Sequence, residues 1–226
     1  MGLWPVACSS VGRFQPPVWL CAAMSHEPSS SDRSAWRLAL PVLTGQTVTL
    51  REPAPADLAP LYQVLVTGDV PQFGLDGDLN ETAVSRFIDA AQEDRARGFA
   101  FSYVITIGAG RHVVGLFQVR ALDPVFESGE WDALLLPSVR GTSVFLESAR
   151  LVGSFVFGSL GTHRLECRVL LQNGRANGAL RKLGASQEGL LRRSVRRHDE
   201  YFDQVLWSVL RDDWAGQWLP TGLRVH

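Results

Sequence analysis

A turn of small residues near the middle of the chain has the composition of an anion-binding site. Residues 134–157 read LLLPSVRGTSVFLESARLVGSFVF: an apolar stretch ends at Pro137, and a short turn leads into residues with helical spacing. The first N–H groups of a helix have no partner within the helix, and together with the helix dipole they stabilise phosphate oxygens. Gly141 allows a phosphate to approach, and Thr142 and Ser143 can add hydroxyl donors. Many such turns bind nothing, so this segment alone indicates only a candidate phosphate site.

Two carboxylates precede this turn on the same expected strand. Glu130 and Asp132 are two residues apart, so their side chains lie on one side of a strand. Beside apolar Leu134, desolvation and mutual repulsion would raise both pKa values. Such a carboxylate suits a general base, which an alkylammonium with a pKa of about 10.4 needs before its nitrogen can attack. We expect Glu130, and next Asp132, in this role; the alternative is that both are ordinary solvated strand residues.

Composition excludes several classes of protein. The chain has 226 residues, of which 46% are apolar and 20% charged, as in globular domains. Its 22 basic and 23 acidic residues predict no nucleic-acid or membrane partner. Three scattered cysteines without a His/Cys cluster predict no disulfide framework, no metal and a reducing, cytoplasmic location. The apolar run at 16–24 is too short to span a membrane and lacks a clear cleavage site, so residues 1–23 are interpreted as a leader or as sequence upstream of a start at Met24.

The elements that position the candidate residues alternate between strand and helix periodicity. Strands are expected at 47–53, 99–107, 113–122, 129–136, 164–171, 187–195 and 201–210. Helices are expected at 58–66 with Asp57 as cap, between Asn80 and Gly98, at 144–157, and at 177–183 before Gly184. This order predicts an α/β fold with a mixed central sheet and helices on both faces. We expect one domain at 41–218, after a disordered or leader segment at 1–40 and before a tail at 219–226.

Four segments in order together resemble the RimJ/RimL-like branch of the GNAT N-acetyltransferases, over roughly 47–214; they are residues 50–65, 134–157, 165–194 and 201–214. The turn at Arg140 is similar to that branch's R/Q-x-x-G-x-G/A loop. Residues 165–194 resemble its N-x-x-A/S-x-x-x-L-x-x-L-G stretch, matched by Asn173, Ala176, Leu180, Leu183 and Gly184. Residues 50–65, LREPAPADLAPLYQVL, look like its opening strand and helix.

The resemblance implies a GNAT fold, in which acyl-CoA wedges into a V-shaped split between two central strands and an amine enters from the opposite side. It implies an enzyme that transfers an acetyl group from acetyl-CoA to a primary amine, on a protein N-terminus or a small molecule. The pyrophosphate would be wrapped by Arg140, Gly141, Thr142, Ser143 and Val144. The backbone of Leu134, Leu135 and Leu136 would meet the pantetheine and the oxyanion, Asn173 would hydrogen-bond the pantetheine arm, and Ala176 would leave room beside it.

The sequence also departs from the family pattern at three positions. Ser143 and Phe145 stand where the loop has small residues, and Phe145 either packs into the core or narrows the cofactor entrance. Leu180 stands where many relatives have the Tyr that reprotonates the CoA thiolate. Two alternatives follow: a non-catalytic acyl-CoA-binding module, or an acyltransferase with a bulkier donor such as succinyl-CoA, its pocket shaped by Phe145 and the arginine cluster at 192–197. The acceptor is not readable from the sequence, and the chain is expected to be a monomer or a homodimer.

Overall fold

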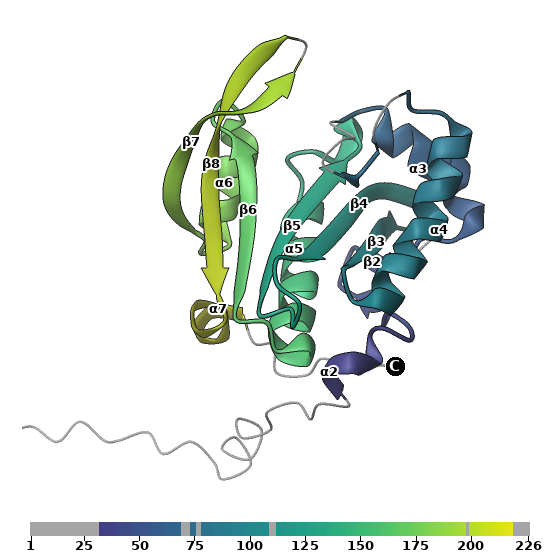
Figure 1. Ribbon diagram of the computed structural model, residues 1–226, viewed down its shortest axis with the longest axis horizontal. Coiled ribbons are helices and arrows are strands. Elements are labelled where there is room, and N and C mark those ends of the chain that lie inside the picture. Colours follow the sequence, from purple (N-terminus) through teal and green to yellow (C-terminus); the bar gives the residue numbers. More distant parts are fainter. Residues whose placement is uncertain (1–31, 69–72, 76–77, 109–111, 198, 219–226) are drawn as a thin grey trace, which may run out of the picture.

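The structure, a computed structural model, describes residues 32–68, 73–75, 78–108, 112–197 and 199–218. Within these residues lies an eight-stranded sheet in the order β1-β2-β3-β4-β5-β6-β8-β7 (Figure 1). Its strands are β1 (Leu43–Thr44), β2 (Thr49–Arg51), β3 (Ala100–Ile107), β4 (His112–Ala121), β5 (Ser128–Leu135), β6 (Arg164–Leu170), β7 (Ser186–Arg197) and β8 (Glu200–Leu210). Neighbouring strands are antiparallel except β5 and β6, which are parallel, so the sheet is mixed as predicted.

Helices cover both faces of this sheet (Figure 1). One face carries α3 (Leu58–Leu65) and α4 (Glu81–Arg97), and the other carries α5 (Val144–Phe155) and α6 (Gly174–Lys182). Shorter elements are α2 (Asp32–Ala35), α7 (Arg211–Trp218), the 3-10 turns η1 (Pro55–Asp57) and η3 (Pro137–Val139), and the π-helical turn η4 (Val156–Leu160). The predicted α/β class is confirmed. Among the described residues, no helix is both long and apolar enough to cross a membrane.

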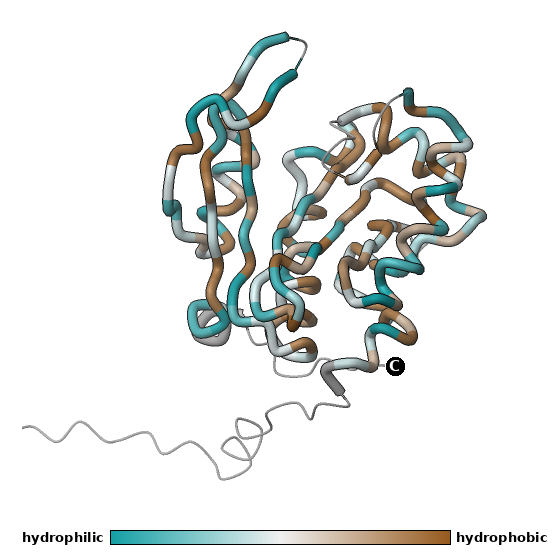
Figure 2. The backbone as a smooth tube through the Cα atoms, in the orientation of Figure 1, coloured by the Kyte–Doolittle hydropathy of each residue, from teal (hydrophilic) through white to brown (hydrophobic). Residues whose placement is uncertain are grey.

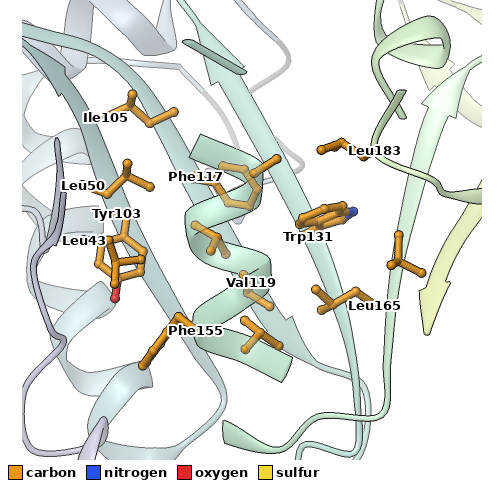
Figure 3. Packing of buried hydrophobic residues seen from close by; sticks show 14 of the residues in the cluster. Leu43, Leu50, Tyr103, Ile105, Phe117, Val119, Trp131, Phe155, Leu165 and Leu183 are labelled. Carbon is orange, nitrogen blue, oxygen red and sulfur yellow. The ribbon is translucent and has the colours of Figure 1, made fainter. Parts of the chain in front are cut away.

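The hydrophobic core has two parts, one on each side of the sheet. Successive residues of a strand face opposite sides, and β4 is apolar on both. Phe117 of β4 and Trp131 of β5 face α5 (Figure 3), whereas Leu116 of β4 and Leu134 of β5 join the cluster under α3 and α4. In Figure 2, β4 is hydrophobic and the outer helix α4 is largely hydrophilic. Both faces of the central strands are therefore covered by packed side chains, so a ligand can reach these strands only at their edges or ends.

The ends of the longest helix follow the predicted caps. The Asn80 side chain accepts a hydrogen bond from the amide of Ala83 at 2.9 Å and begins α4. Gly98 ends it with φ of 79°, a left-handed conformation that suits glycine. The predicted β3–β4 hairpin also forms, with register pairs from Ala100↔Arg120 to Ile107↔His112.

One predicted helix start and one predicted cap need correction. Helix α6 begins at Gly174 rather than at residue 177, because the Asn173 side chain accepts a hydrogen bond from the amide of Ala176 at 3.1 Å and caps the helix. Asp57 precedes α3, but its side chain makes no capping bond to that helix. Its two carboxylate oxygens instead bind the guanidinium of Arg51, each at 2.7 Å, and so tie β2 to the start of α3.

The packed domain starts upstream of the boundary predicted near residue 40. The Trp36 side chain is 4% exposed and lies edge-on to Phe101 and Phe126 of the core. Strand β1 and helix α7, which the sequence pattern did not reveal, add to the same domain. Residues 1–31 of the leader segment predicted at 1–40, and the tail predicted at 219–226, lie outside the described residues.

The parallel strands β5 and β6 pair over only part of their length. Their register pairs are Ser128↔Arg164, Gly129↔Leu165 and Glu130↔Glu166, and β5 then continues to Leu135 and β6 to Leu170 without further pairs. Figure 1 shows the two strands diverging beyond this point. The divergence produces the V-shaped split that the resemblance implied.

Candidate functional site

A cavity of about 1480 Å³ lies where β5 and β6 have separated, bounded by the first turns of α5 and α6 and by the β7–β8 hairpin. Pockets for drug-sized ligands measure about 300 to 1,000 Å³, so this larger space accommodates a longer molecule. The predicted site residues that line it are Asp132, Leu134, Leu135, Arg140, Gly141, Thr142, Ser143, Asn173 and Ala176. Glu130, Leu136 and Val144 were also predicted but do not line the cavity.

The turn before α5 presents backbone amides to this cavity. Gly141 has φ of 86°, and Ser143 has φ of −68°, so serine fits the loop position without strain. Within the described part of the chain, no acceptor binds the amides of Gly141, Ser143, Phe145 or Leu146. The hydroxyl of Thr142 is already used, because it donates to the carbonyl of Val139 at 2.7 Å. The donors that this turn can offer to an anion are therefore amides more than hydroxyls.

The side chain of Arg140 is hydrogen-bonded to other residues of the protein. Its Nε donates to the carbonyl of Leu135 at 2.9 Å, and its Nη2 donates to the carbonyl and hydroxyl oxygens of Thr67 at 3.0 and 3.2 Å. Its amide donates to the carbonyl of Pro137 at 3.3 Å. Arg140 therefore ties the end of β5 to the chain after α3, a contact that the loop pattern did not indicate.

The open edge of β5 presents a different set of backbone groups from the set predicted. The amide of Leu136 donates to the carbonyl of Val114, and the register pairs Leu134 with Leu116, so Leu134 and Leu136 direct their backbone groups towards β4. By the alternation of an antiparallel ladder, Ala133 and Leu135 direct theirs towards the split. The carbonyl of Leu135 accepts from Arg140, which leaves its amide and both groups of Ala133 facing the cavity. Ala133 was missed because strand parity is not readable from an apolar run.

The two carboxylates share one face of β5, as expected, and one arginine binds both. Arg120 Nη2 lies 2.9 Å from Glu130 Oε2 and 3.2 Å from Asp132 Oδ2. Arg168 Nη1 approaches the other Glu130 oxygen at 3.4 Å. The expected mutual repulsion is thus offset by cations. Asp132 lines the cavity, whereas Glu130 is 8% exposed and lies where β5 and β6 still pair.

Three other side chains at the split bear on its chemistry. Cys167 lines the cavity, and burial raises the pKa of its thiol, with a smaller contribution from the charges of Asp132 and Glu130, so the thiol stays protonated. Phe145 was expected either to pack into the core or to narrow the cofactor entrance. In the structure it packs against the core and also lines the cavity. Leu180 is 1% exposed, and no tyrosine is found among the described residues that line the cavity.

The cavity lining is cationic. Among the described residues that line the cavity, six side chains are basic and one, that of Asp132, is acidic. The basic residues come from the turn, β6, α6 and β7, and they are Arg140, Arg168, Arg175, Lys182, Arg196 and Arg197. Of the predicted arginine cluster on β7, Arg196 and Arg197 reach this lining. The sequence pattern did not indicate Arg175 or Lys182, although a cap at Asn173 places Arg175 in the first turn of a helix. Within the described chain, no three His, Cys, Asp or Glu side chains gather as a metal ion requires.

Comparison with known proteins adds the family. Residues 47–186 match the sequence profile of the Acetyltransferase (GNAT) domain. Probable N-acetyltransferase YjcK of Bacillus subtilis strain 168 is 30% identical over 73 residues, which make up 32% of this chain and 40% of that protein. Uncharacterized N-acetyltransferase YnaD of the same strain is 19% identical over 172 residues, which make up 76% of this chain and 98% of that protein.

Solved structures share the fold. RimL, a ribosomal L7/L12 alpha-N-protein acetyltransferase in complex with coenzyme A, aligns with a TM-score of 0.68 and 16% identity over 76% of this chain and 99% of its own. Mycobacterium smegmatis RimJ in complex with CoA-disulfide aligns with a TM-score of 0.63 and 17% identity over 78% of this chain and 91% of its own. The family profile covers more than half of the chain, and the split sheet agrees with it. The chain therefore belongs to the GNAT family of acyl-CoA-dependent N-acetyltransferases.

Proposed function

We propose that this protein transfers the acetyl group of acetyl-CoA to a primary amine, on a protein N-terminus or a small molecule, in the cytoplasm. The observation that carries the proposal is the cavity at the β5–β6 split, which joins three features. It has unpartnered amides at the start of α5, an open strand edge at Ala133 and Leu135, and a carboxylate at Asp132. Together these groups fit a long ligand with an anionic end and a reactive amide-like arm.

The donor would lie along the cavity in one direction. Its pyrophosphate is bound by the amides of Gly141, Ser143, Phe145 and Leu146. Its pantetheine amides pair with the free edge of β5 at Ala133, as an added strand would. This pairing directs the thioester towards Asp132 and Cys167 in the lining. Asn173 caps α6 with its side-chain oxygen, so only its amide nitrogen is left for the pantetheine arm.

The reaction needs a base, an oxyanion donor and a leaving thiolate. The Asp132 and Glu130 pair takes the proton of the ammonium, with Asp132 at the cavity surface. The amine nitrogen then forms its bond to the thioester carbon, and the amide of Leu135 or Ala133 donates to the resulting oxyanion. The nitrogen releases its second proton to water, and the C–S bond breaks as the tetrahedral intermediate collapses to the amide. Because the pKa of a thiol is about 8.5, the CoA thiolate leaves without a tyrosine acid and then takes up a proton from water.

Thiol release tests this proposal. Purified protein is mixed with acetyl-CoA and a panel of peptides, amino acids and polyamines, and free CoA thiol is measured together with the mass of the product. We expect amine-dependent release that falls by about 100-fold or more in Asp132→Asn, as loss of a general base predicts. No release with any amine, in a protein that binds CoA, would leave only the non-catalytic module, for which a variant with Glu130 and Asp132 both changed to Ala would equal wild type.

A second candidate donor is favoured by the cationic lining. Arg168 lies beside the thioester end of the cavity, and its nearest carboxylate oxygens are 3.4 and 4.0 Å away. Such a guanidinium could receive the free carboxylate of succinyl-CoA. Comparing turnover of acetyl-, propionyl- and succinyl-CoA separates the two donors, because only the succinyl preference should disappear in Arg168→Met.

A further inference from the structure

Arg175 stands opposite the phosphate-binding turn, on a different helix. It lies in the first turn of α6, is exposed, and lines the same cavity as Gly141. Its Nε lies 3.9 Å from the point that a β-carbon on Gly141 would occupy. No acidic side chain of the described residues forms an ion pair with it. A cation on a flexible stem therefore faces the turn across a space that no side chain fills.

The turn itself lacks a free cation. The guanidinium of Arg140 is held by the carbonyl groups of Leu135 and Thr67, so its direction is fixed by protein contacts. The turn offers amides, which bind phosphate oxygens but carry only the partial charge of the helix dipole. A pyrophosphate carries full negative charges and gains most from a guanidinium, which can bind two of its oxygens at once.

Gly141 makes the approach from α6 to the turn possible. Its φ of 86° turns the Cα hydrogen, and no side chain, towards Arg175. A phosphate seated on the amides of Gly141 and Ser143 would then have those amides on one side and the Arg175 guanidinium on the other. The first turns of α5 and α6 border the same cavity, so their dipoles add to this field.

We propose that Arg175 is the charged side chain that binds the pyrophosphate of the CoA donor, closing it against the turn at 141–143. This inference rests on the proposed function only in its choice of ligand, because it concerns binding and not acetyl transfer. The loop pattern places the pyrophosphate-binding cation at Arg140, whereas this inference places it on α6, at Arg175.

Calorimetric titration with three ligands tests the assignment. CoA carries the pyrophosphate and the 3′-phosphate, 3′-dephospho-CoA carries only the pyrophosphate, and pantetheine carries neither. In Arg175→Ala we expect Kd to rise by roughly 10-fold or more for CoA and for dephospho-CoA by the same factor, as for the loss of a charged hydrogen bond. Pantetheine binding should not change, and Arg175→Lys should fall between wild type and Ala because it keeps the charge but loses the fork.

The matched control lies on the same helix. Arg181→Ala removes one charge from α6, but Arg181 stacks on Trp207 with 5.3 Å from guanidinium carbon to ring centroid and does not line the cavity. CoA should bind this variant as it binds wild type. Equal CoA affinity in wild type and Arg175→Ala would overturn the proposal, and so would a loss confined to CoA, which would place Arg175 on the 3′-phosphate. A loss that includes pantetheine would also overturn it, since that indicates general damage.

The outcome is separable from the test of the proposed function. If wild type binds CoA in the expected pattern but acetylates no amine, the transferase proposal fails while Arg175 keeps its role. If the amine is acetylated and Arg175→Ala binds dephospho-CoA normally, the present inference fails alone.

Discussion

Arg120→Met should lower the free energy of unfolding at neutral pH. In the structure one guanidinium nitrogen contacts both Glu130 and Asp132, at 2.9 and 3.2 Å, and so offsets part of their combined negative charge. Methionine keeps much of the volume of the side chain and removes the charge. The two carboxylates would then repel each other without this cation, which destabilises the folded protein.

The size of the loss follows from the two contacts. Because both carboxylate oxygens lie close to the same nitrogen, they are no more than about 6 Å apart. Two unit charges at that separation repel by about 3 kcal/mol at an effective dielectric constant of about 20. Solvent screening lowers this value, since 35% of the Arg120 side chain is exposed, and Arg168 still contacts Glu130. We therefore expect the free energy of unfolding to fall by about 1 kcal/mol.

The assay is unfolding in urea at neutral pH, for wild type, Arg120→Met and Arg120→Lys. Arg120→Lys is the control, because it keeps a positive charge beside both carboxylates and loses only the planar fork. It should lose less free energy of unfolding than Arg120→Met. Equal losses in the two variants, or no loss in Arg120→Met, would refute the reasoning that this charge stabilises the pair.

Glu147→Gln should lower the melting temperature at neutral pH, because the Glu147 carboxylate accepts hydrogen bonds from the amide and hydroxyl of Thr47. Burial acts to raise the pKa of Glu147, but these hydrogen bonds outweigh burial and lower the pKa. The stabilisation is therefore complete above pH 4.5 and is lost as the pH falls below that value. The melting temperatures of variant and wild type should converge in acid. Trp214→Ala should reduce the unfolding free energy in urea by about 3 to 5 kcal/mol, because this indole is 1% exposed and packs on Gly153 of α5. Gly141→Ala should strain the turn by about 1 to 2 kcal/mol, because φ is 86°, and calorimetry should show weaker CoA binding.

Periodicity and caps predict most of the fold because they act locally. The asparagine at position 80 and the glycine at position 98 satisfy backbone groups within one helical turn, and both ends of α4 were correct. The start of α6 was placed too late because a cap at Asn173 looks the same in sequence as a ligand-binding asparagine. Strand β1 has two residues and no periodicity of its own, so its place in the sheet depends on the partner Leu50↔Leu43.

The site was less predictable than the fold because side-chain direction depends on tertiary contacts. The positions of Glu130 and Asp132 on one face follow from strand alternation, but the arginine between them comes from β4, across a register that local sequence does not specify. Which residues of β5 face the split depends on the same register, so Ala133 was missed. Arg140 was expected at the pyrophosphate, and its side chain turns to Thr67, distant in sequence by a whole helix and three strands.

The departures from the family loop have a common physical consequence. Where backbone amides bind the anion, the loop requires a suitable backbone conformation and no particular side chain. Ser143, at φ of −68°, supplies its amide as a glycine would. Phe145 keeps its amide as well, while its ring fills space between core and cavity. Such substitutions change the shape of the entrance without removing its donors, so we expect CoA affinity to depend more on the cation at Arg175 than on either side chain. In the proposed mechanism transfer depends instead on the Asp132 end of the split, so we expect variants at the two ends to separate binding from chemistry.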